Sequence, residues 1–380
     1  MRDFSRGCVL FFVGLLGCSA PVEPLDLPDD ASMTGVPVGV RTIETWKGAV
    51  EIWYPASDAH QGEPGETISL GQFVPESVQQ ALNTTYPSLQ TMGIRGAQVR
   101  STESLFPVVV FSHGFGGLRV QSVDITAHLA SRGYVVVAPD HAGRSLPDLL
   151  PCMFSPALEG CNLSTGEDPA MEDVPVALEW LKNAASDEND PLYGRVDLEA
   201  LAIVGHSAGG GSASQLLETD SGFLAAVPMA GTGLVTRDVP VLVMEGTCDG
   251  IVDTASIEES WMAMPDAGLA RFKGAGHLAF SDLCEIDMGA FGREHLESRE
   301  DVNSFFYDSL IQLGTDGCPG ELPEVGPNAD CADGYLDLET STMGIRGLMT
   351  RFLDQVLVRD EAVELESPDP SIEWISASER

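Results

Sequence analysis

Short, uninterrupted apolar runs alternate with helical patterns along most of this chain, and this alternation limits the possible folds most strongly. Such runs are typical of buried strands in a parallel sheet, because other elements cover both of its faces. The runs read "PVVVFSHG", "YVVVAPDH", "LEALAIVG", "FLAAVPMAG", "VPVLVMEG" and "LARFKGAG". We therefore expect an α/β fold in which a mostly parallel, doubly wound sheet is flanked by helices.

The alternation never restarts, which predicts one large domain rather than two small ones. We place it at residues 37–360, after an acidic linker at 18–36 and before an acidic tail at 361–380. Its last helix should carry an apolar stripe on one side. The stripe consists of Ile345, Leu348, Met349, Phe352, Leu353, Val356 and Leu357. Only "TGLVTRD" joins the strand ending in "VPMAG" to the next strand, so we expect no large cap after the sixth strand and an open cleft.

The first seventeen residues resemble an export signal. Arg2 and Arg6 precede an apolar run, Cys8 to Gly17, that is too short to span a bilayer. The run closes on the letters LLGC, which resemble the lipobox of bacterial lipoproteins. That resemblance implies an acylated Cys18 and peripheral attachment to a membrane of the cell envelope. An ordinary secretory signal with an incidental cysteine is the alternative.

The chain is strongly acidic, with a formal net charge of −38. Nucleic acid is excluded as a partner because its phosphates would be repelled. Only Lys47, Lys182 and Lys273 are lysines, and abundant acid with little lysine is typical of proteins in salty surroundings. Solubility alone explains such a charge more simply.

Eight cysteines occur in the chain, and six remain once Cys8 and Cys18 are assigned to the signal and the lipid site. An even number in an exported protein predicts disulfides, although free thiols remain an alternative. Proximity suggests that Cys152 pairs with Cys161 and Cys318 with Cys331, which leaves Cys248 for Cys284. No cysteine–histidine spacing favours a metal site, and the acidic loop at 314–337 misses the spacing of a calcium loop.

The pentapeptide Gly205-His206-Ser207-Ala208-Gly209 follows a predicted strand and begins a helix of small residues. This is the context of a nucleophile elbow, in which a sharp turn exposes the serine hydroxyl at the carboxyl edge of the sheet. We therefore predict that Ser207 is a catalytic nucleophile. A glycine-rich helix start is the alternative.

A serine nucleophile needs a histidine base, which an acid must orient, in the chain order Ser, Asp or Glu, His. His277 follows the last predicted strand, whereas His295 resembles a solvated helical position. Asp249 lies just past the preceding strand, where glycines permit a turn. Asp253 is better explained as a helix cap, and Asp282 could support the histidine from behind. A Cys248–Cys284 bond would then clamp the acid loop to the base loop.

Acyl transfer also requires donors for the oxyanion. The turn after the first buried strand contains His113, Phe115 and three glycines that allow close approach of the backbone. We predict that the amides of Phe115 and Ala208 are the donors. His113 comes too early in the chain to be the base, so we expect it to pack or form a hydrogen bond beneath the loop.

The motifs "VVVFSHGFGG", "GHSAGGG", "GTCDG" and "GAGH", in this order, resemble those of the serine α/β-hydrolases. The stretches "VEIWYPA", "LASRGYVVVAPDHAGRS" and "HLAFSDLC" are similar to the plasma-type platelet-activating factor acetylhydrolases and their bacterial relatives. The glycine-rich elbow also resembles cutinase-like polyester hydrolases. The resemblance covers roughly residues 38 to 283; the acidic insert between Leu313 and Leu338 and the added cysteines depart from it.

This resemblance implies an α/β-hydrolase fold, the triad Ser207, Asp249 and His277, oxyanion amides at Phe115 and Ala208, and ester hydrolysis through an acyl-enzyme without a cofactor. We expect a monomer acting on short-chain or accessible esters, polyesters included. The walls of the cleft should be "LPDLLPCMFSPALEGC" and the insert before Phe106. An amidase or peptidase with the same triad, and a catalytically silent surface-binding lipoprotein, are the alternatives.

Overall fold

The computed structural model describes residues 35–379 apart from residues 165, 287 and 316–335. In this part of the chain a ten-stranded sheet has the order β12-β11-β10-β9-β8-β6-β7-β2-β1-β5. Its strands are β1 Val38–Glu44, β2 Ala49–Pro55, β5 Gly93–Arg95, β6 Phe106–Ser112, β7 Val135–Pro139, β8 Val196–His206, β9 Ala225–Met229, β10 Val241–Gly246, β11 Ala267–Phe272 and β12 Ile372–Ile375. A separate two-stranded sheet pairs β3 Thr67–Ser69 with β4 Ser88–Gln90.

The six central strands, from β7 across to β11, are parallel and correspond to the six apolar runs of the sequence. Nearly all of their residues are buried, because helices cover both faces of the sheet. Outside them, β2 joins β7 in the antiparallel direction and β1 forms a hairpin with β2. The prediction of a mostly parallel, doubly wound sheet is confirmed.

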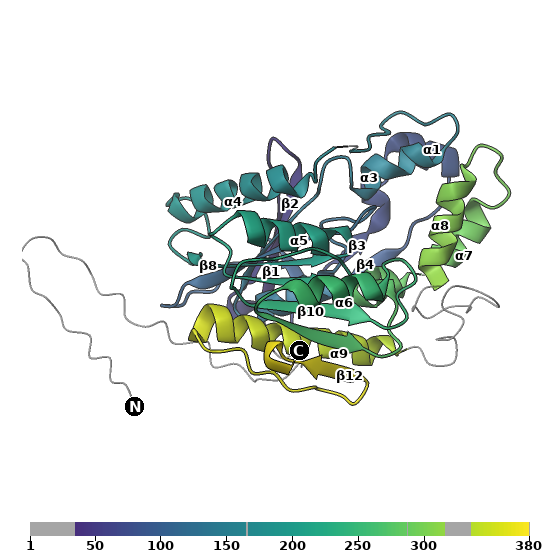
Figure 1. The fold of residues 1–380 in the computed structure, drawn as a ribbon. Helices are drawn as coiled ribbons and strands as arrows, with labels where there is room; N and C mark the ends of the chain where they lie inside the picture. The colour runs from purple at the N-terminus through teal and green to yellow at the C-terminus, as the bar shows by residue number, and fades with distance from the viewer. Residues whose placement is uncertain (1–34, 165, 287, 316–335, 380) are drawn as a thin grey trace, which may run out of the picture.

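A different set of helices covers each face of the sheet (Figure 1). One face carries α2 Val123–Ser131 and α9 Leu338–Leu353. The other face carries α4 Ala170–Ser186, α5 Ala208–Thr219 and α6 Thr254–Ala263. None of the helices in the described residues combines the length and the apolar composition needed to cross a bilayer.

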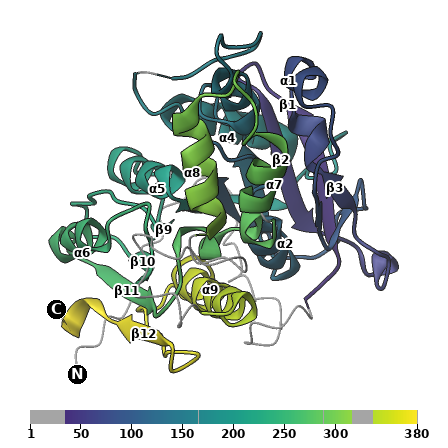
Figure 2. The same cartoon turned by 90° about the vertical axis from the view of Figure 1, so that its right-hand side faces the viewer.

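A further group of helices lies at the edge of the sheet where the parallel strands end; we call it the helical cover (Figure 2). It consists of α1 Glu76–Leu82, α3 Leu146–Leu149, the 3₁₀ turn η3 Leu150–Met153, α7 Met288–His295 and α8 Ser304–Thr315. Its own small apolar cluster buries Val74, Val78, Met153, Phe154 and Leu296. The sequence predicts two of these walls, whereas α7 and α8, which follow the candidate base, are an addition that it does not predict.

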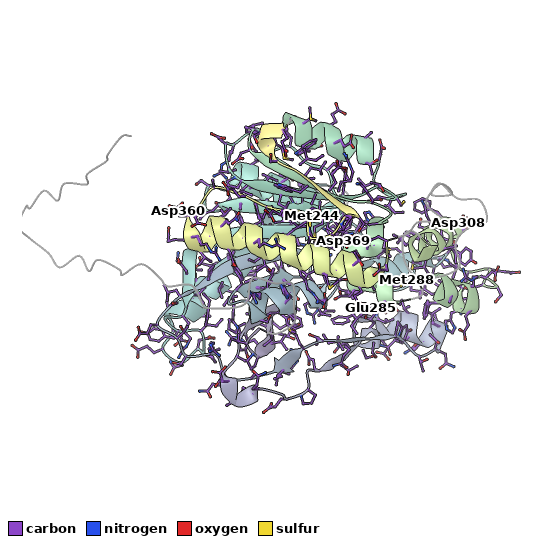
Figure 3. All side chains as sticks on the ribbon, turned by 90° about the horizontal axis from the view of Figure 1, so that it is seen from below. Met244, Glu285, Met288, Asp308, Asp360 and Asp369 are labelled. Atoms are coloured by element: carbon purple, nitrogen blue, oxygen red, sulfur yellow. A yellow bond between two sulfur atoms is a disulfide. The ribbon has the colours of Figure 1, made fainter. Side chains whose placement is uncertain are left out.

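The C-terminal residues return to the sheet. Figure 3 shows α9 crossing below the sheet, with Asp360 just past the π-helical turn η7, Asp354–Arg359. Farther along, β12 pairs with β11 in the antiparallel direction, and its Ile372 is buried. The segment at 361–380 is therefore more than the acidic tail that its composition suggests, because it contains an edge strand. Short 3₁₀ turns complete the described chain: η1 Asp58–His60, η2 Leu70–Phe73, η4 His277–Phe280, η5 Asp282–Glu285 and η8 Ala377–Glu379.

Candidate active site

Ser207 occupies the sharp turn between β8 and α5. Its backbone has φ 59° and ψ −123°, a conformation that is costly for a residue with a side chain and that occurs mainly at functional sites. The turn requires glycine on both sides. A Cβ at Gly205 would lie 2.0 Å from the carbonyl oxygen of Gly209, and a Cβ at Gly209 would lie 2.0 Å from that of Ser112. The strand-turn-helix context predicted for Ser207 is confirmed.

His277 and Asp249 meet at the ends of neighbouring parallel strands. Asp249 follows β10 and His277 follows β11, and Nδ1 of His277 lies 2.8 Å from Oδ2 of Asp249. The other oxygen of Asp249 accepts hydrogen bonds from the backbone N–H groups of Ile251 and Val252, at 2.9 and 2.8 Å. The carboxylate is fully buried and rigidly held. It therefore keeps the proton of His277 on Nδ1 and fixes the tautomer of the ring.

His277 lies next to the elbow. The carbonyl oxygen of His277 accepts a hydrogen bond from Nε2 of His206, the residue before Ser207, at 2.9 Å. The centroids of the two imidazole rings are 4.8 Å apart. The fold thus brings all three predicted triad residues to one edge of the sheet.

The loop after β6 approaches the elbow from the opposite side. A Cβ at Gly114 would lie 3.1 Å from Cβ of Ser207, so this loop packs directly on the candidate nucleophile. The carbonyl oxygen of Gly114 accepts hydrogen bonds from Nδ1 of His113, at 2.7 Å, and from the N–H of Gly117, at 3.1 Å. Because a trans peptide unit directs its C=O and the following N–H to opposite sides, these bonds also fix the direction of the Phe115 N–H.

The two predicted oxyanion amides are available for a ligand. The N–H of Phe115 donates to no acceptor among the described residues. Ala208 is the first residue of α5, and the first N–H groups of a helix lack intrahelical acceptors. The helix dipole adds a partial positive charge at the same place. An oxyanion on a carbon bonded to Ser207 would be stabilised there.

Beneath this loop lies a cluster of buried polar groups. Nε2 of His113 accepts the backbone N–H of His141 at 2.9 Å, so His113 carries its proton on Nδ1 and is neutral. Arg144 donates to the carbonyl oxygen of His113 at 3.0 Å and to Asp168 at 2.8 Å. Nδ1 of His141 lies 3.3 Å from Asp173. The expectation that His113 lies beneath the loop and forms hydrogen bonds is confirmed.

Burial controls the protonation of these groups. Desolvation, followed by repulsion from nearby cationic groups, holds the pKa values of His113 and His141 well below the ordinary range. Burial also lowers the pKa of His206 to about 3 and raises the pKa of Asp173 to about 6. All three histidines are therefore neutral at neutral pH.

The residues considered as alternatives to the base and the acid of the triad have other partners. His295 is in α7, where its Nε2 lies 3.2 Å from the hydroxyl of Thr84. Asp253 caps α6 by accepting the N–H of Ala255. Asp282 accepts the N–H of Asp124 at 2.8 Å, and burial raises its pKa well above the ordinary range. None of these three side chains is paired with His277 or Asp249 in the described part of the chain.

The cysteines pair differently from what we expect. Cys152 and Cys161 form the predicted disulfide, the one such bond that joins two described residues. Cys248 and Cys284 are also disulfide-bonded, but not to each other within the described residues, so the predicted Cys248–Cys284 pair is a wrong assignment. The predicted Cys318–Cys331 pair, the acidic loop at 316–335 and Cys18 lie outside the described residues.

The helical cover touches the site on two sides. A Cβ at Gly116, in the loop after β6, would lie 3.0 Å from a methyl carbon of Leu149 in α3. On the other side, Nε2 of Gln312 in α8 donates to the carbonyl oxygen of Gly250, next to Asp249, at 3.1 Å. Leu313, at the end of the same helix, packs on Leu278, the residue after the candidate base.

A cavity of about 400 Å³ adjoins the elbow on the side of Ala208. Its walls come from one face of α5, the loop after β9 and the segment before α4, and they are partly polar and partly apolar. The lining residues are Asp168, Ala208, Gly211, Gln215, Glu218, Thr232, Gly233 and Leu234. In the described part of the chain, no three His, Cys, Asp or Glu side chains are grouped so that they could hold a metal ion.

Sequence reasoning missed Gln121, whose side chain is buried between the loop after β6 and His206. It also missed the helical hairpin of α7 and α8. The only sequence signal for Gln121 is a polar residue just before a strongly apolar helix, and the same pattern marks many solvated helix starts.

Comparisons with known proteins agree with this fold. The family model described as "Platelet-activating factor acetylhydrolase, isoform II" matches residues 46–148, and the model described as "PET hydrolase-like" matches residues 163–267. The platelet-activating factor acetylhydrolase of Cavia porcellus is 26% identical over 268 residues, which are 61% of this chain and 60% of that protein. The enzyme of the same name from Bos taurus is 25% identical over 47% of this chain and 49% of its own length.

The chain thus matches only about half to three fifths of the length of these two relatives. A solved structure, that of a ferulic acid esterase from Streptomyces cinnamoneus, matches 89% of this chain and 96% of its own, with a TM-score of 0.56 and 22% identity. That likeness establishes the fold. The chain thus has an α/β-hydrolase fold, and parts of its sequence resemble the platelet-activating factor acetylhydrolases and the PET hydrolase-like proteins.

Proposed function

We propose that this protein is a carboxylic-ester hydrolase that works through a covalent acyl-enzyme on Ser207. The observation that carries the proposal is the 2.8 Å hydrogen bond between His277 and the buried Asp249, formed next to the strained elbow of Ser207. A serine hydroxyl becomes a useful nucleophile only when such an oriented base can take its proton. The printed names of the relatives, acetylhydrolase, PET hydrolase and ferulic acid esterase, support esters as the substrate class.

In the first half of the proposed reaction, Oγ of Ser207 attacks the ester carbonyl carbon while Nε2 of His277 takes the hydroxyl proton. Asp249 stabilises the resulting imidazolium. The N–H groups of Phe115 and Ala208 hold the oxyanion of the tetrahedral intermediate, where each donor contributes roughly 2.7–4 kcal/mol. The intermediate collapses by breaking the bond to the alcohol, which leaves with the proton from His277.

In the second half, water replaces the alcohol. Nε2 of His277 takes a proton from the water as its oxygen attacks the acyl carbon. The second tetrahedral intermediate uses the same two N–H groups. Its collapse breaks the bond to Oγ of Ser207, which regains its proton from His277, and the carboxylic acid leaves. No cofactor enters either half.

We propose short-chain or accessible esters, polyesters included, as substrates. The short link between β9 and β10 supports this, because no helix from that position covers the elbow. The cavity of about 400 Å³ beside Ala208, with Gln215, Glu218 and Thr232 among its lining residues, supports a small ester group that carries polar substituents. The edge strand β12 has only four residues, which limits pairing between sheets and supports a monomer.

We further propose that the protein is exported and held at the cell envelope through an acylated Cys18. The disulfide bonds of Cys152, Cys161, Cys248 and Cys284 support export, because such bonds persist in oxidising compartments. Metabolic labelling with a radioactive fatty acid tests the anchor. The label should be absent from a Cys18→Ser variant, and an unlabelled wild-type protein would contradict lipidation.

Fluorophosphonate labelling and p-nitrophenyl acetate hydrolysis test the enzyme. The reagent should modify Ser207, and Ser207→Ala should lose both the labelling and the hydrolysis while its thermal unfolding is unchanged. Ser212→Ala, on the same helix but with its hydroxyl bonded to Asp168, is the matched control for labelling. A folded wild type without labelling or ester turnover would instead indicate a binding protein. Faster turnover of the matched anilide would indicate an amidase.

A further inference from the structure

A continuous chain of buried hydrogen bonds crosses the site behind Ser207. The backbone N–H of Gly114 donates to Oε1 of Gln121 at 3.2 Å. Nε2 of Gln121 donates to Nδ1 of His206 at 2.8 Å. Nε2 of His206 then donates to the carbonyl oxygen of His277 at 2.9 Å. One glutamine and one histidine thus connect the loop after β6 to the backbone of the candidate base.

The direction of every bond in this chain is fixed by its two ends. A backbone N–H can only donate, so the atom of Gln121 that faces Gly114 must be the amide oxygen. Its amide nitrogen therefore faces His206 and places the lone pair of that imidazole on Nδ1. A backbone carbonyl can only accept, so the proton of His206 must be on Nε2, facing His277. Burial lowers the pKa of His206 to about 3, which keeps this neutral form.

Gln121 binds the base loop with its backbone as well. Its carbonyl oxygen accepts a hydrogen bond from the hydroxyl of Ser281 and another from the N–H of Asp282, both at 3.2 Å. The side chains of Gln121 and His206 are almost fully buried. Water therefore cannot readily replace a missing partner, and an unpaired polar group here would destabilise the folded protein.

In the loop after β6, Gly117 leaves the space that the side-chain amide of Gln121 occupies. A Cβ at Gly117 would lie only 2.0 Å from Oε1 of Gln121. The atom it meets is the end of a flexible side chain, so a methyl group there would displace the amide of Gln121 rather than unfold the backbone. Gly117→Ala therefore provides a second way to break the chain of hydrogen bonds.

We propose that Gln121, acting through His206, is a positioning residue that holds the oxyanion loop and the loop of the base at a fixed spacing across the nucleophile. Gln121 touches neither substrate nor reacting atoms. Its side chain holds the backbone of Gly114 in place, and the next residue, Phe115, supplies the predicted oxyanion donor. Through His206 it also holds the backbone of His277 in place. This role rests on the proposed ester hydrolysis, because it is defined by the geometry of that reaction.

The expected consequence is a loss of turnover rather than of binding. Displacement of a catalytic group by about 1 Å can lower a rate about 100-fold. Gln121→Met keeps the volume of the side chain but removes both of its hydrogen bonds. We expect kcat for p-nitrophenyl acetate to fall about 10- to 100-fold, with KM changed less than about twofold. Gly117→Ala should cause a similar fall, and it should add little to Gln121→Met, since both break the same chain.

Gln355→Met is the matched control. Gln355 likewise accepts a backbone N–H through Oε1 and donates to a backbone carbonyl through Nε2, in both cases of Glu364, but it lies in η7 away from the site. This variant should keep the kcat of the wild type. The low-field proton NMR signal of Nδ1–H of His277, assigned by its loss in His277→Gln, gives a readout that does not depend on turnover. It should shift or broaden in Gln121→Met and Gly117→Ala but not in Gln355→Met.

The outcomes separate the two proposals. An inactive wild type, or an active Ser207→Ala, would overturn the ester hydrolase, and the NMR signal would still report on the role of Gln121. An unchanged kcat and an unchanged His277 signal in Gln121→Met would overturn the positioning role while the hydrolase stands. If Gln121→Met does not fold, Gly117→Ala carries the same test. A fall in kcat that strictly follows a fall in melting temperature also counts against it.

Discussion

The two walls of the candidate site are built in different ways. On the sheet side, buried polar groups hold each loop, and the side chains of Asp249 and His277 are almost completely buried. On the cover side, a small apolar cluster and a disulfide hold short helices together, and Phe305 of α8 is 69% exposed. Directional bonds fix positions closely, whereas apolar packing around few residues allows adjustment. The difference suggests that the sheet side determines the chemistry and the cover determines which esters reach it.

The position of the cover supports this division. It contacts the oxyanion loop through Leu149 and the acid loop through Gln312, yet it supplies none of the predicted triad residues. Loops and added helices at the carboxyl edge of a sheet can vary while the strands beneath them stay fixed. Variants on the sheet side should therefore change kcat, and variants in the cover should change KM and substrate preference.

The largest expected effect is that of Asp249→Asn. An amide at this position would leave His277 with the wrong tautomer, so we expect kcat to fall about 10⁴-fold with little change in fold. Steady-state hydrolysis of p-nitrophenyl acetate and circular dichroism provide the measurement. Asp253→Asn, four residues along the same loop, makes the same change of carboxylate to amide at a helix cap and is the matched control, because asparagine can still accept the N–H of Ala255. A variant with more than a tenth of wild-type kcat would show that Asp249 does not orient the base.

A smaller effect, on stability, should come from Asp173 beneath the oxyanion loop. Burial raises its pKa to about 6 from an ordinary value of 3.8, so the folded protein binds this proton more tightly than the unfolded chain does. The stabilisation is complete below about pH 4 and is lost as the pH rises through about 6, by about 3 kcal/mol in all. Asp173→Asn should remove this loss.

Urea unfolding at pH 4 and pH 7 tests the expectation. Relative to the wild type, the unfolding free energy of Asp173→Asn should increase by up to about 3 kcal/mol between the two pH values. Glu179→Gln, an exposed change on the same helix α4, should follow the wild type. Parallel pH profiles for Asp173→Asn and the wild type would contradict a pKa of Asp173 raised by burial.

The smallest effect is expected in the cover. Replacing both Cys152 and Cys161 by serine opens a short loop and should lower the unfolding free energy by about 2 kcal/mol. The kcat for p-nitrophenyl acetate should stay within about twofold of the wild type, while KM for bulkier esters should rise. Met153→Leu, a volume-conserving change in the same segment, serves as the control. An equal loss of kcat for every ester would show that the two walls are not separable.

The fold and the core of the site could be predicted because both depend on local patterns. Apolar runs predict buried strands wherever helices cover both faces, and a glycine-flanked serine between a strand and a helix predicts an elbow. Asp249 and His277 followed from chain order and from their place after successive parallel strands. The structure brings these two side chains to hydrogen-bonding distance, while their roles in turnover stay a prediction.

Other features depend on contacts between distant segments, which no local pattern reveals. The pairing of Cys248 and Cys284 is one case, because both are disulfide-bonded but not to each other among the described residues. Gln121 is another, since its importance comes from three loops that meet only after folding. The helices α7 and α8 have short, mixed sequences whose apolar faces are recognisable only against the cluster that they cover.

The return of the C-terminus to the sheet has a consequence for how the molecule is made. β12 borders β11, the strand that leads to His277, and the N–H of Lys273 donates to the carbonyl oxygen of Ser371 at 2.8 Å. Because β12 comes well after β11 in the chain, the strand that leads to His277 acquires its outer neighbour only when this later segment has been synthesised and has docked. Maturation of the base loop is in this way tied to the docking of β12.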